Sequence, residues 1–425
     1  MSDVSVEAES ATGLTNAERA GNVVGGVVPA VIVSSRGAAR ARSGHPWIFR
    51  TDVLTSGGRG AQHATAAQTP APGAEVRVCD ARGNFIARAF WAERSPIALR
   101  VVSRKDEPLD TAFLRARLAA ALQRRRELGL TEGGAFRLAH GEADLLPGYF
   151  VDIYGSTATV QHLAEWAEAR RDELAALVAE VAGVSCVVAR DDGSARDFEG
   201  LPRHKGVLLG AAPKELIYRE GSIELSVDLL EDHKTGGFLD QRENHLLAGA
   251  LARGTALDAF CYHGGFALQL ARKSTQVLAI DQDAAAVART RENAKRNGLS
   301  NIEVRAANAV EQLRALDKEG RRFDVVVLDP PAFAKRRDGL EAALRAYKEI
   351  NYRGVRLLAP GGLLITCSCS GKVTQELFGE VVAFAAQEAK RPLQLLERRG
   401  AARDHPALIG VPETEYLKAW FLRAP

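Results

Sequence analysis

The sequence predicts an α/β protein whose carboxyl-terminal half is a doubly wound parallel sheet. Residues 255–281, TALDAFCYHGGFALQLARKSTQVLAID, have the pattern of a strand, a glycine turn, an amphipathic helix and a second strand. From residue 214 to 425, further apolar strand-like runs alternate with helical periodicity, as they do in such a sheet. Residues 30–104 contain short β-type runs between turn signals, and residues 105–213 mix both patterns. We therefore expect a small closed β-domain, a central α+β domain and an α/β domain.

Each domain is expected to contain particular elements. The first holds strands at 31–35, 74–80, 85–92 and 97–103, with a flexible loop at 57–73. The central domain holds a helix at 109–130 with a basic outer face, a strand at 150–163, a helix at 168–183, a strand at 185–190 and a polar loop at 191–205. The last adds a helix at 284–297, strands at 302–307, 323–331 and 361–371, and a late edge strand at 415–424.

Composition restricts the class of protein. Residues 1–29 contain no basic segment before an apolar core, so they read as a disordered tail and not as a signal peptide. No run of 18 apolar residues predicts a membrane span. The five cysteines form no Cys-x-x-Cys pair, which argues against a metal site and a disulfide framework. We expect reduced thiols and a cytoplasmic location.

The charge is distributed unevenly along the chain. Residues 30–104 carry 11 arginines, no lysine and four acids, a net charge of +7 against +3 for the whole chain. Clustered arginine at one end of a near-neutral chain indicates a phosphate-bearing partner.

The glycine turn indicates which ligand the α/β domain binds. Asp281 follows Gly265 by 16 residues, near the spacing at which an acid meets a ribose hydroxyl. The turn lacks the Gly-x-Gly-x-x-Gly pattern that admits a pyrophosphate, and Tyr262 and His263 would crowd one. Asp258 and the adjacent glycines instead suit a ligand with a cationic amino-acid tail, which favours S-adenosylmethionine over NAD. The alternative is an ordinary strand-turn-helix without a ligand.

Two further strand ends carry candidate chemistry. Asp329, followed by Pro330 and Pro331, stands at the carboxyl end of its strand, where prolines could hold the acid toward a base or merely end the strand. Cys367 and Cys369 point to one face of another strand, with Cys369 nearer its end. Buried cysteines are usually inert, so the case for Cys369 rests on its pairing with Asp329.

Thiolate and carboxylate together suit methylation of a pyrimidine carbon. Carbon 5 of cytosine is too weak a nucleophile to attack a methyl sulfonium, but a thiolate that adds to carbon 6 makes it carbanion-like. An acid hydrogen-bonded to the ring edge stabilises the developing charge. Nitrogen methylation needs no thiolate.

With these motifs assembled, the chain resembles the bacterial rRNA large subunit methyltransferase I family, which makes 5-methylcytosine in 23S rRNA. The likeness covers nearly all of the chain after residue 30. It rests on the segments Asp258–Phe266, Asp329–Phe333, Ser368–Gly371, His233–Arg242, His45–Phe49 and Gly141–Gly148.

The resemblance implies a class I (Rossmann-like) methyltransferase domain at 214–425, after a β-barrel PUA-like RNA-binding domain at 30–104 and an α+β domain at 105–213. It implies Cys369 as the nucleophile and Asp329 as the acid that binds the base. Residues implied to bind the cofactor are Asp258, Phe260, Gly264, Gly265, Asp281, Asn308, Gln241 and Arg242.

The partners implied are 23S rRNA, free or in an assembling particle, and no membrane, and a homodimer is allowed. Asn308 stands where many methyltransferases have an aspartate for the adenine amino group, and its amide oxygen can accept the same hydrogen bond. Ala332 replaces a second cysteine that assists product release in many RNA 5-methylcytosine enzymes, so release would need another base or water.

Two other functions stay open on the residues alone. The same scaffold could methylate another base atom, in which case Cys369 would be idle. A non-catalytic RNA-binding or ribosome-assembly factor could also keep the cofactor fold. Binding of S-adenosylmethionine separates the second of these from any methyltransferase. For His45-Pro46-Trp47, a buried turn is as consistent with the sequence as direct contact with RNA.

Overall fold

The computed structural model describes residues 28–54, 69–232, 235–333 and 339–425. Nearly all of the expected disordered tail, most of the expected flexible loop, and His233 and Lys234 fall outside these ranges. The chain divides into two compact units. One takes in the chain up to Leu114 with His162–Leu174 and Ser194–Arg203, and the other takes in Arg115–Gln161, Ala175–Gly193 and His204–Pro425. No helix among the described residues is long and apolar enough to cross a membrane.

The first unit is built on a five-stranded sheet in the order β1-β3-β4-β5-β2. An isolated bridge between Val33 and Val53 joins the chain just beyond β1 to the chain just beyond β2, so the two ends of the sheet meet, as expected for a closed β-domain. The strands are β1 (Ala30–Ile32), β2 (Trp47–Phe49), β3 (Glu75–Cys79), β4 (Phe85–Trp91) and β5 (Ile97–Ser103).

A short helix in this unit was not predicted. Helix α2 (Ser35–Arg42) begins at Ser34, whose hydroxyl accepts a hydrogen bond from the backbone N–H of Gly37. Its buried face is made of Gly37, Ala38 and Ala41. Residues this small give no strong apolar stripe, which explains why the helix is hard to see in an arginine-rich sequence.

The central sheet has the strand order β10-β9-β8-β7-β6. The single strand expected at 150–163 is two strands joined at Gly155, and the loop expected at 191–205 contains the short helix η3 (Ser194–Glu199). The strands are β6 (Ala135–His140), β7 (Tyr149–Tyr154), β8 (Thr157–His162), β9 (Cys186–Asp191) and β10 (His204–Leu209), and the helices are α3 (Thr111–Glu127), α4 (Glu165–Ala169) and α5 (Arg171–Ala182).

The basic outer face expected for the first of these helices is incomplete. Arg125 of α3 is only 2% exposed, and its guanidinium donates to both carboxylate oxygens of Asp144 at 2.5 and 2.6 Å. It also donates to the backbone carbonyl of Asp404 at 2.7 Å. The long cationic side chain of Arg125 thus points inward, because the buried carboxylate of Asp144 pairs with it.

The α/β domain contains a seven-stranded sheet in the order β15-β14-β13-β16-β17-β19-β18. The first five strands are parallel, as predicted, and β19 runs antiparallel to both β17 and β18. The strands are β13 (Thr255–Ala259), β14 (Gln276–Asp281), β15 (Ile302–Ala306), β16 (Phe323–Leu328), β17 (Leu358–Ser368), β18 (Gln394–Arg399) and β19 (Lys418–Arg423), and a hairpin of β11 (Leu216–Glu220) and β12 (Ile223–Val227) precedes them.

The prediction of a carboxyl-terminal edge strand was wrong. β19 lies inside the sheet, and the true edge is β18, which was not predicted. The sequence of β18, QLLERR, is mostly exposed and has neither a clear alternation nor an apolar run. The edge strand β18 therefore shows no strand pattern in its sequence, whereas the buried β19 shows an apolar run.

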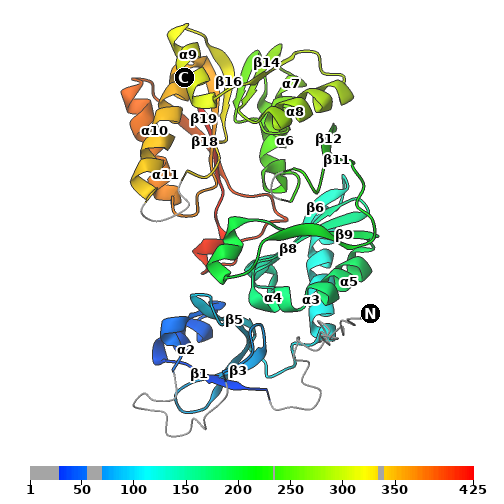
Figure 1. Ribbon diagram of the computed structural model, residues 1–425. Coiled ribbons are helices and arrows are strands. Elements are labelled where there is room, and N and C mark those ends of the chain that lie inside the picture. The colour runs from blue at the N-terminus through cyan, green and yellow to red at the C-terminus, as the bar shows by residue number, and fades with distance from the viewer. Residues whose placement is uncertain (1–27, 55–68, 233–234, 334–338) are drawn as a thin grey trace, which may run out of the picture. The chain divides into compact units, whose positions relative to one another are not determined.

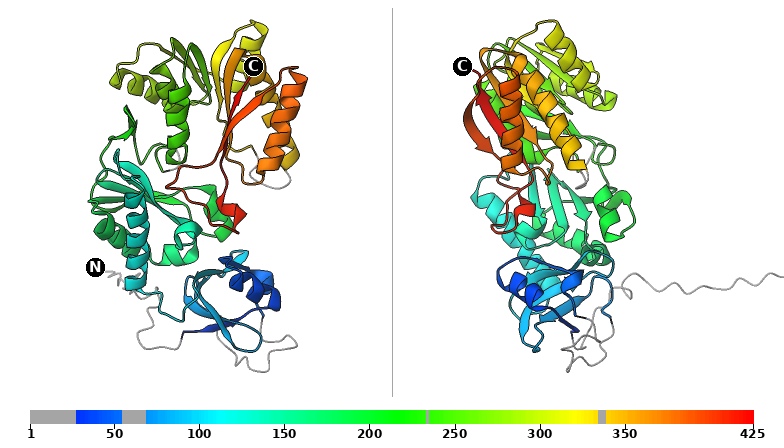
Figure 2. Two further views of the ribbon diagram at one scale, coloured as in Figure 1. Left: turned by 180° about the vertical axis from the view of Figure 1, so that it is seen from behind. Right: turned by 90° about the vertical axis from the view of Figure 1, so that its left-hand side faces the viewer.

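Helices cover both faces of this sheet, as Figures 1 and 2 show. One apolar core lies between the sheet and α9, α10 and α11, and the other involves α6, α7 and α8. The helices are α6 (Arg242–Leu251), α7 (Gly265–Ala271), α8 (Ala284–Arg296), α9 (Ala309–Lys318), α10 (Leu340–Arg356) and α11 (Gln375–Glu388). Open sheets covered on both faces bind ligands at the carboxyl ends of their strands.

The buried pair of Arg125 and Asp144 yields a prediction about stability. Asp144→Ala should leave a buried guanidinium unpaired and lower the stability of the second unit by about 3–5 kcal/mol. The matched control is Glu180→Ala, which breaks the pair with Arg115, whose side chains are 44% and 56% exposed, and should cost less than about 1 kcal/mol. Urea unfolding followed by circular dichroism measures both. Equal midpoint shifts in the two variants would contradict the assignment.

Candidate active site

Three acids that the sequence singled out meet at the carboxyl edge of the sheet. Asp258 is in β13, Asp281 ends β14 and Asp329 follows β16 directly. β13 pairs in parallel with both β14 and β16, so the three carboxylates stand side by side. This arrangement is as expected, and it concentrates negative charge where a ligand would bind.

The loop after β13 is held in a strained conformation. Phe260 and Tyr262 have φ angles of +73° and +47°, in the left-handed region that costs a non-glycine residue on the order of 1–3 kcal/mol. Two side chains of α8 hold the loop. Thr290 donates its hydroxyl to the carbonyl of Tyr262 at 2.6 Å, and the buried amide of Asn293 donates to the carbonyl of His263 at 3.1 Å.

The two glycines of this loop are required for different reasons. Gly264 has a φ of +88°, and a Cβ there would lie 2.9 Å from Thr290. A Cβ on Gly265 would lie 2.4 Å from the ring of His245, whose Nδ1 is hydrogen-bonded with the buried Glu220 at 2.7 Å. Both glycines therefore serve close packing around the start of α7 as well as any ligand.

Asp281 shapes the same loop. One of its carboxylate oxygens accepts a hydrogen bond from the backbone N–H of Tyr262 at 2.9 Å, and the other accepts from the N–H of Asp283 at 3.0 Å. A carboxylate has about four acceptor positions, so each oxygen keeps one for a ligand hydroxyl. The acid is thus oriented before any ligand arrives.

Asp258 is the least satisfied group of the site. It is 1% exposed, the Ala267 N–H is directed at it, and neither oxygen completes a well-formed hydrogen bond. Burial raises its pKa well above the ordinary value, and the negative charges of Asp329 and Asp281 raise it further. A buried carboxylate of this kind is stabilised by a cationic ligand, which is the charge that an amino-acid tail or a sulfonium carries. The donor set therefore fits S-adenosylmethionine.

Asn308 stands at the end of β15 as predicted, but its amide oxygen already has two partners. It accepts from the backbone N–H groups of Val310 and Glu311 at 3.0 and 3.2 Å and so begins α9. Its side chain is exposed at the same edge.

The two candidates at the start of α6 have different surroundings. The side chain of Gln241 donates to Asp329 at 2.9 Å and accepts from Asn244 at 2.7 Å. Arg242 donates to the carbonyl of Ala135 at 2.6 Å and to Asp404 at 3.0 Å. Gln241 is therefore part of the acid cluster, whereas Arg242 joins the α/β domain to β6.

The two cysteines at the end of β17 differ in exposure. Cys367 is fully buried, and burial together with the charge of Asp329 raises its pKa well above the ordinary value. Cys369 lies just past the strand and is partly exposed. β16 and β17 are adjacent and parallel, so Asp329 and Cys369 follow neighbouring strand ends. Of the two thiols, Cys369 has the access that a nucleophile needs.

Sequence analysis missed Thr290, Asn293 and His245, which build the loop, and the contact between Gln241 and Asp329. The two α8 residues sit among exposed polar residues of a helix, and only their place opposite the loop gives them a function. The adjacent Gly264 and Gly265 were the available signal that the loop is tightly packed.

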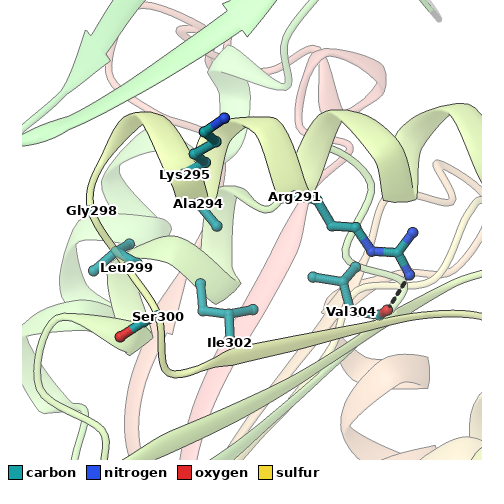
Figure 3. Close-up of a pocket in the computed structure, with 8 residues that line it drawn as sticks. All are labelled: Arg291, Ala294, Lys295, Gly298, Leu299, Ser300, Ile302 and Val304. Carbon is teal, nitrogen blue, oxygen red and sulfur yellow. Dashed lines mark hydrogen bonds between the residues drawn. The ribbon is translucent and has the colours of Figure 1, made fainter.

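A separate hollow of about 430 Å³ lies between α8 and β15 (Figure 3). Arg291 spans it and donates to the carbonyl of Val304 at 2.6 Å. The acids described above do not line it. It is a surface feature of the sheet edge and not part of the candidate active site.

Comparisons with known proteins agree with this architecture. A family model described as a PUA-like domain matches residues 31–104, and one described as a methyltransferase domain matches residues 252–400. A solved structure described as SMU.776, a methyltransferase in complex with SAH, superposes with a TM-score of 0.78 at 18% identity, over 93% of this chain and 100% of that one. At this identity the likeness concerns the fold.

The fold and the matched domains define a class I, S-adenosylmethionine-dependent methyltransferase that carries a PUA-like domain. Ribosomal RNA large subunit methyltransferase I of Tolumonas auensis is 38% identical over 389 residues, which is 89% of this chain and 95% of that protein. The protein of the same name from Erwinia tasmaniensis is 37% identical over 386 residues, again 89% and 95%. The chain belongs to the ribosomal RNA large subunit methyltransferase I family.

The buried carboxylate of Asp258 predicts opposite effects on stability and on binding. Its folded-state pKa is raised, so stability is greatest below the unfolded pKa and is lost as pH rises through the folded value. Asp258→Asn should therefore raise the unfolding temperature of the ligand-free protein near pH 7.5. The same change should weaken S-adenosylmethionine binding by roughly tenfold or more, because a hydrogen bond to a charged group is worth about 1.5–3 kcal/mol.

Thermal unfolding and isothermal titration measure the two effects on one preparation. Asp324→Asn is the matched control, because Asp324 binds the backbone N–H of Thr255 at the opposite end of β13. It should leave the affinity unchanged. Unaltered affinity in Asp258→Asn would show that this acid does not face the ligand.

Proposed function

We propose that this protein transfers a methyl group to carbon 5 of a cytosine in 23S rRNA through a covalent bond between Cys369 and carbon 6. The observation that carries the proposal is the partly exposed thiol of Cys369 beside Asp329, at two adjacent parallel strand ends. A methyltransferase that modifies a ring nitrogen has no use for such a thiol, whereas carbon 5 must first be activated.

The reaction uses the two side chains at opposite positions on the base. The Cys369 thiolate adds to carbon 6, and the electron pair of the 5,6 double bond moves to carbon 5. Asp329, held by Gln241 at 2.9 Å, hydrogen-bonds the ring edge and so stabilises the charge that develops there. When bound, S-adenosylmethionine supplies the electrophilic methyl group. Loss of the carbon 5 proton to a base or water then restores the double bond and expels the thiolate.

The cofactor roles follow the geometry of the acid cluster. Asp258 faces the cationic amino-acid tail, and Asp281 accepts from the ribose hydroxyls with the acceptor positions that its backbone contacts leave. Phe260, Gly264 and Gly265 form the loop against which the cofactor lies. Asn308 meets the adenine edge through its amide N–H groups, because its amide oxygen accepts from Val310 and Glu311.

The remaining two cofactor candidates act less directly in this proposal. Gln241 acts from beside Asp329, where it can meet the reactive end of the cofactor. Arg242 supports the segment through its buried contacts with Ala135 and Asp404.

The amino-terminal unit is proposed to bind RNA through its exposed arginines. Arg88 and Arg100 are only 9% and 5% exposed and are held in ion pairs with acids of the same unit, so they serve the fold. Arg42, Arg82 and Arg94 are exposed. Arg42 pairs with Asp80 at 2.8 Å, but its side chain is 55% exposed, so it can exchange that partner for a phosphate. We place the protein in the cytoplasm, where reducing conditions keep the thiol competent. A homodimer stays a prediction.

The two cysteines give a direct test of the mechanism. Cys369→Ala should abolish methyl transfer while S-adenosylmethionine binding persists, because the thiol acts on the base. Cys367→Ala is the matched control two residues away, and it should still methylate at the cost of some packing energy. An RNA with 5-fluorocytosine at the target should trap wild-type enzyme covalently, because fluorine cannot leave as a proton does. Mass spectrometry of the RNA and a gel for the adduct give the readouts.

The outcomes separate the alternatives. Methylation that persists in Cys369→Ala and vanishes in Cys367→Ala would assign the nucleophile to the inner cysteine. Methylation in both variants and in the double variant would mean that the enzyme modifies a nitrogen.

Arginine substitutions test the RNA-binding role. Removing one arginine–phosphate interaction should flatten the slope of log affinity against log salt by roughly 0.7–0.9. The triple variant of Arg42, Arg82 and Arg94 to glutamine should therefore show a shallower slope in fluorescence anisotropy with an rRNA fragment. A variant with the same change at the exposed Arg272, Arg314 and Arg345 alters net charge equally and should keep the wild-type slope. Identical slopes in the two variants would refute a special role for the first unit.

A further inference from the structure

Lys418 of β19 is a buried lysine close to Cys369, and the reaction described above assigns it no task. Lys418 is only 2% exposed. The register of the antiparallel pair places Lys418 opposite Ser368, the residue before Cys369. Lys418 therefore belongs to the strand end that carries the thiol.

The ammonium group is fixed on both sides of that strand end. It donates to the carbonyl of Ser370 at 2.8 Å and to the carbonyl of Tyr416 at 2.7 Å. Ser370 is also held by the hydroxyl of Tyr347 at 3.0 Å. An ammonium has three N–H donors, and these two carbonyls use two of them. Lys418 therefore clamps the residue that directly follows Cys369.

No ion pair joins Lys418 to an acid among the described residues. Burial lowers its pKa to about 8, and the nearby Cys369 and Glu415 act in the opposite direction. A buried cation without a carboxylate partner is costly, which argues for a function. Because the interaction between two ionisable groups is mutual, an ammonium favoured by Cys369 in turn favours the Cys369 thiolate.

The other groups around the thiol do not supply this charge. The carboxylate of Asp329 opposes ionisation of a nearby thiol, and the thiol of Cys367 is neutral because burial raises its pKa. Burial likewise raises the pKa of Tyr347 and Tyr416, so both phenols stay neutral. Of these named groups, Lys418 alone is cationic.

We propose that Lys418 is a positioning residue for methyl transfer, whose ammonium fixes the turn after Cys369 through Ser370 and stabilises the Cys369 thiolate. The use of that thiolate rests on the proposed function. The acidity of the thiol does not, because it can be measured on the full chain without RNA or cofactor.

The experiment is alkylation by iodoacetamide as a function of pH, with Cys369 followed by mass spectrometry of its peptide. Only the thiolate reacts, so the midpoint of the rate profile reports the thiol pKa. In Lys418→Met the midpoint should rise by about one pH unit, and the rate below pH 8 should fall about tenfold. The plateau at high pH should match wild type. Lys418→Arg keeps the charge and should restore most of the acidity.

Lys372→Met is the matched control, because Lys372 is exposed and lies three residues after Cys369. It should leave the midpoint within about 0.3 pH units of wild type, since exposed charges are screened. An unchanged midpoint in Lys418→Met, or equal shifts in both variants, would overturn the proposal. If Lys418→Met does not fold, the wild-type profile decides: a midpoint at or above the ordinary thiol value of about 8.5 also overturns it. Methylation by Cys369→Ala would instead refute the proposed function and leave the thiol measurement intact.

Discussion

The burial of the Asp258 carboxylate is the constraint on which the rest of the site depends. A charge at the end of β13 with no well-formed hydrogen bond disfavours the ligand-free fold, and the neighbouring Asp329 and Asp281 increase that cost. Backbone strain at Phe260 and Tyr262 adds to it. Such costs persist only where surrounding contacts over-determine the conformation. Here Thr290 and Asn293 of α8 do so, and they make the loop rigid before the ligand binds.

A second network, made of buried hydrogen bonds around Asp404, lies within the larger unit. The loop between β18 and β19 carries Asp404, which accepts from Arg242 and from the backbone N–H of Arg137, while its carbonyl accepts from Arg125. Burial alone would raise the pKa of Asp404, but the hydrogen bond from His405 and the charges of His405 and Arg242 hold it at about 2. The acid is therefore ionised at any pH at which the protein functions. It ties α3, β6 and α6 to one anchor.

The meeting of the three acids at one edge of the sheet followed from the sequence because it depends on local order. Strands that end in Asp281 and Asp329, and a turn with Gly264, are consecutive features, and the parallel sheet brings consecutive strand ends to one edge. The features that sequence analysis missed are those settled by contacts between distant segments. Arg125 has the composition of a surface residue and is buried only because Asp144 faces it. The inner position of β19 depends on β18, whose exposed residues carry no pattern.

The orientation of Asp329 likewise depends on a contact with a distant segment of the chain. Asp329 is oriented by Gln241, which lies 88 positions earlier in the chain, and Gln241 is itself held by Asn244 of α6. The segment before α6 thus contacts the acid that would bind the base, although the sequence suggested only a role over the cofactor. Cofactor and base would then share one support. In the proposed mechanism a displacement of α6 would disturb both ligands together, which would couple the binding of the methyl donor to the orientation of the acceptor.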